Sequence, residues 1–189
     1  YARMTNTPAS TLLHLGPGLG NAVANLHNAK KANSPMVNII GEHATYHVEY
    51  DAPLTADIEG IASPVSHWVK TSPDAKSIAA DGAAAIAAAN QPPGQIASLI
   101  LPANTAWDAA DTVADTPEAP GRARVNEKAI ETAVSVLKSG APTLLMMTGQ
   151  SLYEYGLNLA GRIATSTGAR LMAQGSNQRL QRGAGIVPL

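Results

Sequence analysis

Short apolar runs alternate with longer stretches of helical periodicity along the first hundred residues. Each short run is closed by glycine, proline or a polar residue, as expected of a buried strand, whereas Leu19, Val23 and Leu26 recur near helical spacing. Strands that alternate with helices predict an α/β fold, a parallel sheet flanked by helices. The predicted strands are residues 10–15, 36–40, 67–70 and 95–101, and the predicted helices are residues 19–32, 56–60 and 74–90.

The pattern changes after residue 102. Residues 103–125 contain mainly alanine, aspartate, threonine and proline with few large apolar side chains, which is typical of a linker. Helices are predicted again at 126–138 and 152–165, with strands at 143–147 and 170–173. With only about two strands, this second unit is an incomplete Rossmann-like α/β domain, and we expect its core to be incomplete. The predicted domains are therefore residues 1–102 and 126–189, joined by the linker 103–125.

Composition narrows the classes of function. The 189 residues are 45% hydrophobic and 14% charged with a formal net charge of -1, so the chain is globular. We expect no nucleic-acid partner, because clustered Lys and Arg would supply most of the affinity for one. The sequence has no cysteine, which excludes disulfides and thiolate metal sites and fits a reducing cytoplasm. No apolar run reaches the ~18 residues that a membrane helix needs, so we expect no membrane partner and a cytoplasmic location.

The most informative local motif joins the first predicted strand to the first predicted helix. Gly16-Pro17-Gly18 predicts a tight turn, because glycine adopts positive φ and lets a ligand approach the backbone at the start of a helix. Together with Glu42 the turn is a near match to a dinucleotide fingerprint, although Asn21 replaces the third glycine. A dinucleotide site, another cofactor site and a structural turn without a ligand all stay open on these residues alone.

The loop after the second predicted strand is the most polar and ring-rich stretch of the chain. It contains His43 and His47, followed by Glu49 and Asp51. Two histidines four residues apart bind one metal ion only on a helix, and this loop has no helical pattern, so we predict no metal site. Histidine titrates near neutral pH, which makes His43 and His47 candidates for proton transfer at an active site. The alternative is that they are exposed loop residues without a role.

Five runs of residues occur in a recognisable order. They are Tyr1-Ala2-Arg3-Met4-Thr5, Leu12-Leu13-His14-Leu15-Gly16-Pro17-Gly18-Leu19-Gly20-Asn21, Ala24-Asn25-Leu26-His27-Asn28-Ala29, Pro35-Met36-Val37-Asn38-Ile39-Ile40-Gly41 and Ala97-Ser98-Leu99-Ile100-Leu101-Pro102. Together they resemble the thiamine-diphosphate-dependent enzymes of the acetolactate synthase type. The resemblance covers most of residues 1–102, which correspond to that family's pyrimidine-binding domain without its opening. Residues 126–189 resemble the start of its central domain.

The resemblance implies an enzyme that uses thiamine diphosphate to decarboxylate a 2-keto acid and to transfer the resulting carbon unit. It implies that Gly16, Pro17, Gly18 and Asn21 border the pyrimidine end of the cofactor. It places the family's catalytic glutamate upstream of Tyr1 and its magnesium and diphosphate motif in a carboxy-terminal domain. We therefore interpret the chain as a fragment that is inactive by itself. The resemblance also implies a homo-oligomer, and it leaves FAD binding by the central domain open.

The identity of the 2-keto acid substrate is open as well. Pyruvate decarboxylases have a His-His pair in the loop where His43 and His47 stand apart in this sequence. An acetolactate-synthase-like enzyme for another 2-keto acid and a benzoylformate-decarboxylase-like enzyme both fit these residues. Two alternatives come from other classes: a Rossmann-like dinucleotide-binding module, and a non-catalytic subunit that completes the site of a partner chain.

Overall fold

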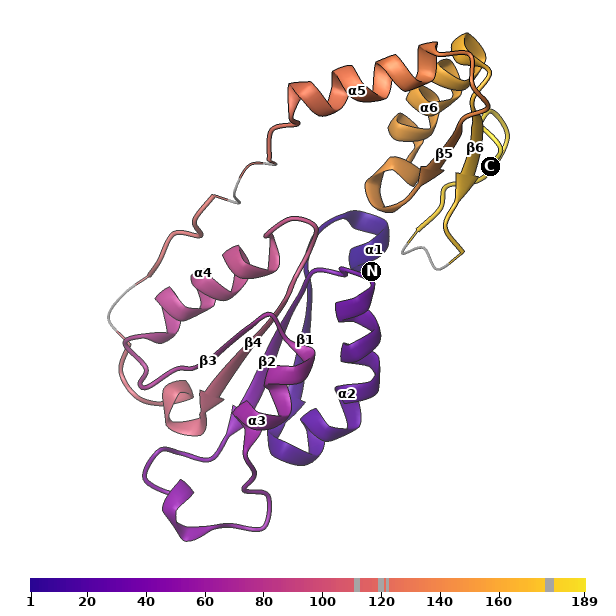
Figure 1. Cartoon of the computed structure of the whole chain (residues 1–189). Coiled ribbons are helices and arrows are strands. Elements are labelled where there is room, and N and C mark those ends of the chain that lie inside the picture. Colours follow the sequence, from indigo (N-terminus) through magenta and orange to yellow (C-terminus); the bar gives the residue numbers. More distant parts are fainter. Residues whose placement is uncertain (111–112, 119–120, 122, 176–178) are drawn as a thin grey trace. The chain divides into compact units, whose positions relative to one another are not determined.

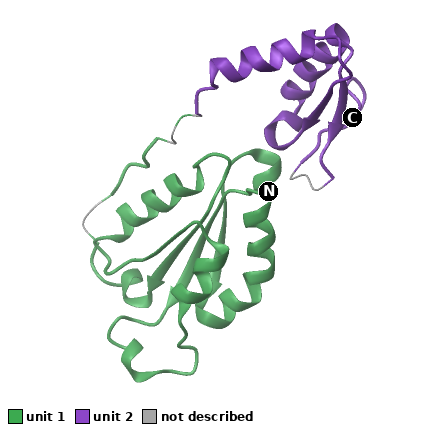
Figure 2. Ribbon diagram, in the orientation of Figure 1, with its two compact units in different colours: residues 1–121 green, residues 122–189 purple. Residues whose placement is uncertain are grey.

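The computed structural model describes residues 1–110, 113–118, 121, 123–175 and 179–189. The chain divides into two compact units, residues 1–121 and residues 122–189 (Figure 1, Figure 2). The boundary between them falls inside the stretch 103–125 that the sequence predicts to be a linker.

Unit 1 is built on a four-stranded parallel sheet. Its strands are β1 (Ala9–His14), β2 (Met36–Glu42), β3 (Trp68–Thr71) and β4 (Ile96–Pro102), in the spatial order β1-β2-β4-β3. Leu12 lies opposite Ile39, and Ile39 lies opposite Leu99, so the register continues across the first three strands of this order. The predicted parallel α/β sheet is confirmed, and each strand begins within one residue of its predicted start.

The helices of unit 1 follow the prediction less closely at their starts. The predicted helix at 74–90 begins only at Ile78, because Asp74 Oδ1 accepts hydrogen bonds from the backbone N (2.8 Å) and Oγ (2.9 Å) of Ser77 and holds the preceding residues in a turn. No helix in the described ranges is long and apolar enough to cross a membrane. The helices are α1 (Ala2–Thr5), α2 (Leu15–Lys31), α3 (Ile58–Ala62) and α4 (Ile78–Ala89), and the 3₁₀ turns are η1 (Val48–Tyr50), η2 (Ser63–Val65) and η3 (Ala103–Ala106).

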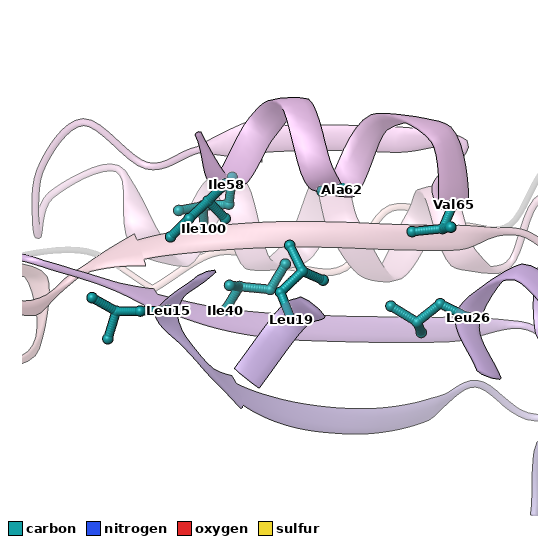
Figure 3. Close-up of a cluster of buried hydrophobic side chains, with 8 residues drawn as sticks. All are labelled: Leu15, Leu19, Leu26, Ile40, Ile58, Ala62, Val65 and Ile100. Atoms are coloured by element: carbon teal, nitrogen blue, oxygen red, sulfur yellow. The ribbon is translucent and has the colours of Figure 1, made fainter. Parts of the chain in front are cut away.

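Helices cover both faces of the sheet in unit 1. On one face, α2, α3 and the strands bury a shared set of apolar side chains, drawn in Figure 3: Leu15, Leu19, Leu26, Ile40, Ile58, Ala62, Val65 and Ile100. On the other face, Ala85 and Ala89 of α4 pack against Ala97 and Leu99 of β4. Leu12 belongs to this second face but lies on the edge strand β1, where its side chain is 81% exposed.

A row of hydrogen-bonded polar side chains crosses the interior of the sheet. Thr11 Oγ1 donates to Asn38 Oδ1 (2.7 Å), and Asn38 Nδ2 donates to Ser98 Oγ (3.1 Å). The hydroxyl groups of Ser98 and Ser66 lie 2.7 Å apart. Asn38, Ser66 and Ser98 are buried, so these hydrogen bonds replace the ones that water would otherwise make. We call this row the polar ladder.

Unit 2 has a much smaller core. It contains α5 (Glu127–Lys138), β5 (Leu144–Met147), η4 (Gly149–Leu152), α6 (Glu154–Thr167) and β6 (Arg170–Ala173), with β5 and β6 paired in parallel. The buried apolar residues within its described part are Leu152, Leu157, Ala160 and Ala169. Two strands with so few buried side chains form only a small α/β core. That unit 2 is an incomplete domain stays a prediction.

Candidate functional site

The carboxyl ends of three parallel strands define one edge of the sheet in unit 1. His14 lies opposite Gly41, and Glu42 lies opposite Pro102, so β1, β2 and β4 end side by side. Ligands of open parallel α/β sheets bind beyond this edge. The start of α2, the loop 43–57 and η3 directly follow these strand ends (Figure 1) and are therefore the segments that can build a site.

α2 begins directly at the end of β1, without the predicted glycine turn. The helix starts at Leu15, whereas the sequence predicts a turn over Gly16-Pro17-Gly18 and a helix from Leu19. The positive φ that we expect at the glycines falls on Leu15, at 50°, and the burial of this side chain holds it in that conformation. Pro17 fits the first helical turn because no N–H is needed there for the helix. The predicted conformation of the turn is therefore wrong.

Gly16 and Gly18 are glycines because of packing inside unit 1. A Cβ atom on Gly16 would lie 2.4 Å from Cβ of Ala56, and one on Gly18 would lie 3.3 Å from Cβ of His14. The first distance is far below van der Waals contact, and the second is a tight one. The absent side chains make room for the protein's own chain and bring the end of the loop 43–57 against the start of α2. The predicted cofactor-binding role of these two glycines stays a prediction.

Pro17 and Asn21 are the predicted cofactor residues that a ligand can reach. Both are exposed, and because they are four residues apart they lie on one face of α2. Gly20 lies between them on the same side, and no atom lies within 4 Å of the position its Cβ would occupy. The space in front of this surface is therefore open. We call Pro17, Gly20 and Asn21 the α2 face.

His43 and His47 meet although they lie on no α-helix. Their ring centroids are 5.4 Å apart with an interplanar angle of 61°, and the ring of Tyr50 lies 5.7 Å from that of His47. Such edge-on contacts are favourable between aromatic rings. The successive turns of this loop, and no helix, bring the two histidines into contact. No group of three His, Cys, Asp or Glu residues is placed to hold a metal ion within the described part of the chain.

Two polar atoms of the loop are buried without a hydrogen-bond partner among the described residues. They are Nε2 of His43 and Oγ1 of Thr55. A buried polar group without a partner costs about 1–3 kcal/mol, and such groups call for a water or ligand partner. Both residues belong to the loop that follows β2 at the carboxyl edge, so this loop has unused capacity for hydrogen bonds.

Asn104, which the sequence analysis missed, anchors the loop to the sheet. Its Oδ1 accepts the backbone N–H of Thr45 (2.9 Å), and its Nδ2 donates to Oδ2 of Asp108 (3.1 Å). Asn104 is buried in η3, directly after β4, in the stretch predicted to be a linker. The signal that could have identified it is a polar residue immediately after a buried strand, at the edge where ligands bind.

The shifted pKa values of unit 1 accompany structural hydrogen bonds. Burial, with a smaller contribution from Lys30, lowers the pKa of His67, whose Nδ1 accepts the backbone N–H of Ile96 (3.0 Å). Hydrogen bonds from Ser77 lower the pKa of Asp74. The neutral imidazole and the ionised carboxylate are the forms that these hydrogen bonds require. The two pKa shifts therefore reflect hydrogen bonds that stabilise the fold.

A family comparison shows which known domain this part of the chain resembles. Residues 1–78 match the family described as thiamine pyrophosphate enzyme, N-terminal TPP binding domain. The matched segment contains β1, α2, β2, the loop 43–57 and β3. Residues 1–78 are therefore similar to this thiamine pyrophosphate enzyme domain. The resemblance noted from the sequence is thereby confirmed, and it is carried by the segment that builds the candidate site.

A similar curated protein is longer than the chain itself. A Mycobacterium tuberculosis protein, named provisionally as an acetolactate synthase large subunit, IlvX, is 46% identical over 187 residues, which is 98% of this chain and 36% of the relative. The chain thus spans about a third of the length of this relative.

Solved structures of thiamine diphosphate enzymes share the fold. A provisionally assigned thiamin diphosphate-dependent enzyme from Mycobacterium smegmatis superimposes with a TM-score of 0.85, over 95% of this chain and 35% of that chain, at 23% identity. A thiamine diphosphate-dependent 4-hydroxybenzoylformate decarboxylase from Rhodococcus jostii RHA1 gives a TM-score of 0.82 over 94% of this chain and 34% of that chain, at 20% identity. At these identities the likeness shows the fold alone.

Proposed function

We propose that this chain supplies the pyrimidine-binding domain of a thiamine-diphosphate-dependent enzyme. The proposed enzyme is acetolactate-synthase-like: it decarboxylates a 2-keto acid and transfers the resulting carbon unit. The family match over residues 1–78 carries the proposal, because it coincides with the sheet edge where the α2 face and the loop 43–57 lie. The relative that is 46% identical and named as an acetolactate synthase large subunit supports this choice of reaction.

The residues at this edge fit the pyrimidine end of the cofactor. An aminopyrimidine is a flat ring with N–H donors and ring-nitrogen acceptors, so it needs open space and polar partners. The α2 face offers the open space and the amide of Asn21, and the loop offers the unpaired atoms of His43 and Thr55. The diphosphate end of the cofactor has no such set of partners, because the described residues include no group of His, Cys, Asp or Glu that could hold a magnesium ion. We therefore expect the magnesium and diphosphate site to come from outside this chain.

When bound, thiamine diphosphate supplies a thiazolium ring that acts as an electron sink. The residues of this chain would then divide the remaining tasks. Pro17 and Asn21 border and orient the aminopyrimidine, while Gly16 and Gly18 keep the start of α2 packed in place. His43 and His47 exchange protons with the 2-keto acid. Because the pyrimidine-activating glutamate and the metal site are expected elsewhere, the isolated chain is expected to be inactive and to complete its site in a homo-oligomer. We propose no FAD site in unit 2, because its described part contains only a two-stranded sheet.

Binding of the cofactor to the chain tests the proposal directly. We expect thiamine diphosphate to shift the NMR signals of the Asn21 side-chain amide and of the His43 and His47 rings. Thiamine without the diphosphate should give shifts of the same pattern, because only the pyrimidine end contacts this chain. NAD and FAD should leave these signals unchanged, which also tests the dinucleotide alternative.

A matched pair of asparagines on α2 supplies the control. Asn21→Leu should weaken thiamine diphosphate binding about tenfold, because a hydrogen bond to the ring and its complementary polarity are lost (~1.4 kcal/mol). Asn25→Leu changes another exposed residue, one helical turn further from the sheet edge, and should leave binding unchanged. Equal binding by both variants, or shifts caused by NAD at Asn21, would contradict the proposed site.

A further inference from the structure

Both ends of the buried side-chain amide of Asn104 form hydrogen bonds to exposed residues. Its Oδ1 accepts the backbone N–H of Thr45 (2.9 Å), and its Nδ2 donates to Oδ2 of Asp108 (3.1 Å). An N–H group can only donate and an ionised carboxylate can only accept, so these two partners leave one orientation for the amide. Asp108 therefore fixes which atom of Asn104 faces the loop 43–57.

Asn104 is itself held at the end of a central strand of the sheet. β4 ends at Pro102, and η3 follows directly. Oγ1 of Thr105 donates to the backbone O of Pro102 (2.7 Å), and the backbone O of Asn104 accepts the N–H of Asp108 (2.9 Å). Thr45, in contrast, belongs to an irregular loop. The hydrogen bond from Thr45 to Asn104 therefore fixes part of this loop relative to the sheet.

The turn that contains Thr45 separates the two histidines of the loop. The backbone N–H of His47 donates to the backbone O of Ala44 (2.7 Å), which closes a β-turn. In such a turn the N–H of the second residue, here Thr45, has no partner inside the turn. His43 directly precedes the turn and His47 ends it, and their ring centroids are 5.4 Å apart. The orientation of the turn therefore decides whether the two rings meet.

Solvation of the Thr45 N–H alone does not require a buried asparagine. Thr45 is exposed, and water can satisfy a backbone N–H in an exposed turn. A buried amide costs free energy unless its own hydrogen bonds are made. A water molecule also leaves the loop free to move, whereas the amide of Asn104 holds it in one place. Restraint of the loop is therefore what this buried side chain adds.

We propose that Asn104 is a positioning residue for the histidine pair His43 and His47. Its hydrogen bond fixes the turn against the end of β4, and the fixed turn holds the two rings in contact. Asp108 acts one step further back, because it sets the orientation of the Asn104 amide. The role in catalysis rests on the proposed function, in which the two histidines exchange protons with the 2-keto acid.

NMR spectroscopy of the 189-residue chain tests the proposal. The wild-type chain should show an NOE between the ring protons of His43 and His47 and slow hydrogen exchange at the Thr45 amide. Asn104→Leu removes the acceptor and should abolish this NOE and speed up the exchange at least about tenfold, which corresponds to ~1.4 kcal/mol. Thr105→Val removes a buried hydroxyl group from the same turn and should leave both measurements unchanged.

An exchange of the two side chains separates positioning from a general loss of stability. Asn104→Asp keeps an acceptor for the Thr45 N–H but places two carboxylates side by side, so it should weaken the NOE and speed up the exchange. Adding Asp108→Asn supplies a donor again and should restore both measurements, even if Asn104→Leu does not fold. An Asn104→Asp variant that behaves as the wild type would refute the role of Asp108.

Three outcomes would overturn the role of Asn104. They are a wild-type chain without the NOE, an NOE that survives Asn104→Leu, and a double variant, Asn104→Asp with Asp108→Asn, that does not regain it. Loss of the NOE in Thr105→Val would overturn it as well, because any damage to η3 would then disturb the histidines.

Added thiamine diphosphate distinguishes this proposal from the proposed function. Any shift of the His43 and His47 ring signals in the wild type should be smaller in Asn104→Leu, while the Asn21 amide signal responds as before. Equal ring shifts in the two chains would contradict the positioning role. If none of these signals shifts in the wild type, the proposed function fails, and the NOE and exchange measurements still decide whether Asn104 positions the histidines.

Discussion

Replacing Gly16 by alanine tests whether packing against the loop fixes the start of α2. The new Cβ would lie 2.4 Å from Cβ of Ala56, whereas carbon atoms in contact are about 3.5–4.0 Å apart. The helix start or the segment around Ala56 must therefore move by about 1 Å or more. Overpacking of this kind costs about 1–3 kcal/mol. We expect Gly16→Ala to lower the free energy of unfolding of unit 1 by that amount.

Gly20 on the same helix provides a control with the opposite sign. No atom lies within 4 Å of its absent Cβ, so alanine fits there without a clash. Alanine is favoured over glycine inside a helix by about 1 kcal/mol. Gly20→Ala should therefore raise the free energy of unfolding by up to that amount, although it adds the same methyl group only four residues away.

Urea unfolding followed by tryptophan fluorescence measures both changes. Trp68 packs against the core on the α4 face and reports on unit 1. We expect a lower midpoint for Gly16→Ala and a higher one for Gly20→Ala, with slopes close to that of the wild-type chain. A Gly16→Ala midpoint equal to that of the wild type would refute the inference that the loop and the start of α2 are packed against each other.

Two further predictions concern buried polar contacts. Asn38→Val removes the middle of the polar ladder and leaves the Ser98 hydroxyl with one hydrogen-bond partner fewer. It should therefore lower the free energy of unfolding by about 2–3 kcal/mol in the same urea assay. An unchanged midpoint would contradict this. Burial lowers the pKa of His67 from 6.5, so its contribution to stability is complete above pH 6.5 and is lost as the pH falls through the lower folded value. His67→Asn keeps an acceptor for the N–H of Ile96 but does not titrate. Its melting temperatures at about pH 7.5 and pH 5 should therefore differ less than those of the wild type. An equal difference would refute the inference that His67 causes this pH dependence.

The strands of unit 1 could be predicted because their signal is local. A buried parallel strand is a short apolar run, and each of the predicted runs pairs in the sheet. The start of α2 could not be predicted in the same way. Glycine is the residue expected to adopt positive φ, and only burial in the core explains why Leu15 adopts it instead. Gly16 and Gly18 lack side chains because a Cβ atom there would come too close to Ala56 or His14. The spacing of residues in the sequence does not reveal these contacts.

The candidate site was predictable in its location and less so in its contacts. The carboxyl ends of parallel strands share one edge, so the sequence alone places the start of α2 and the loop 43–57 at the same edge. The ring contact between His43 and His47 depends on turns of an irregular loop, which has no periodic signal. The anchor Asn104 is distant in sequence from Thr45, and their hydrogen bond appears only when β2 and β4 pair.

The polar ladder also carries information about strand alignment. Thr11, Asn38 and Ser98 occupy matching positions in three neighbouring strands. Apolar side chains tolerate a shift along the sheet, but a two-residue slip of β1 would place Leu13 or Ala9 opposite Asn38 and leave its buried amide without Thr11. The ladder therefore penalises every alignment except the observed one. By doing so it keeps the ends of β1, β2 and β4 level, and the edge on which the proposed site depends is set by hydrogen bonds in the middle of the sheet.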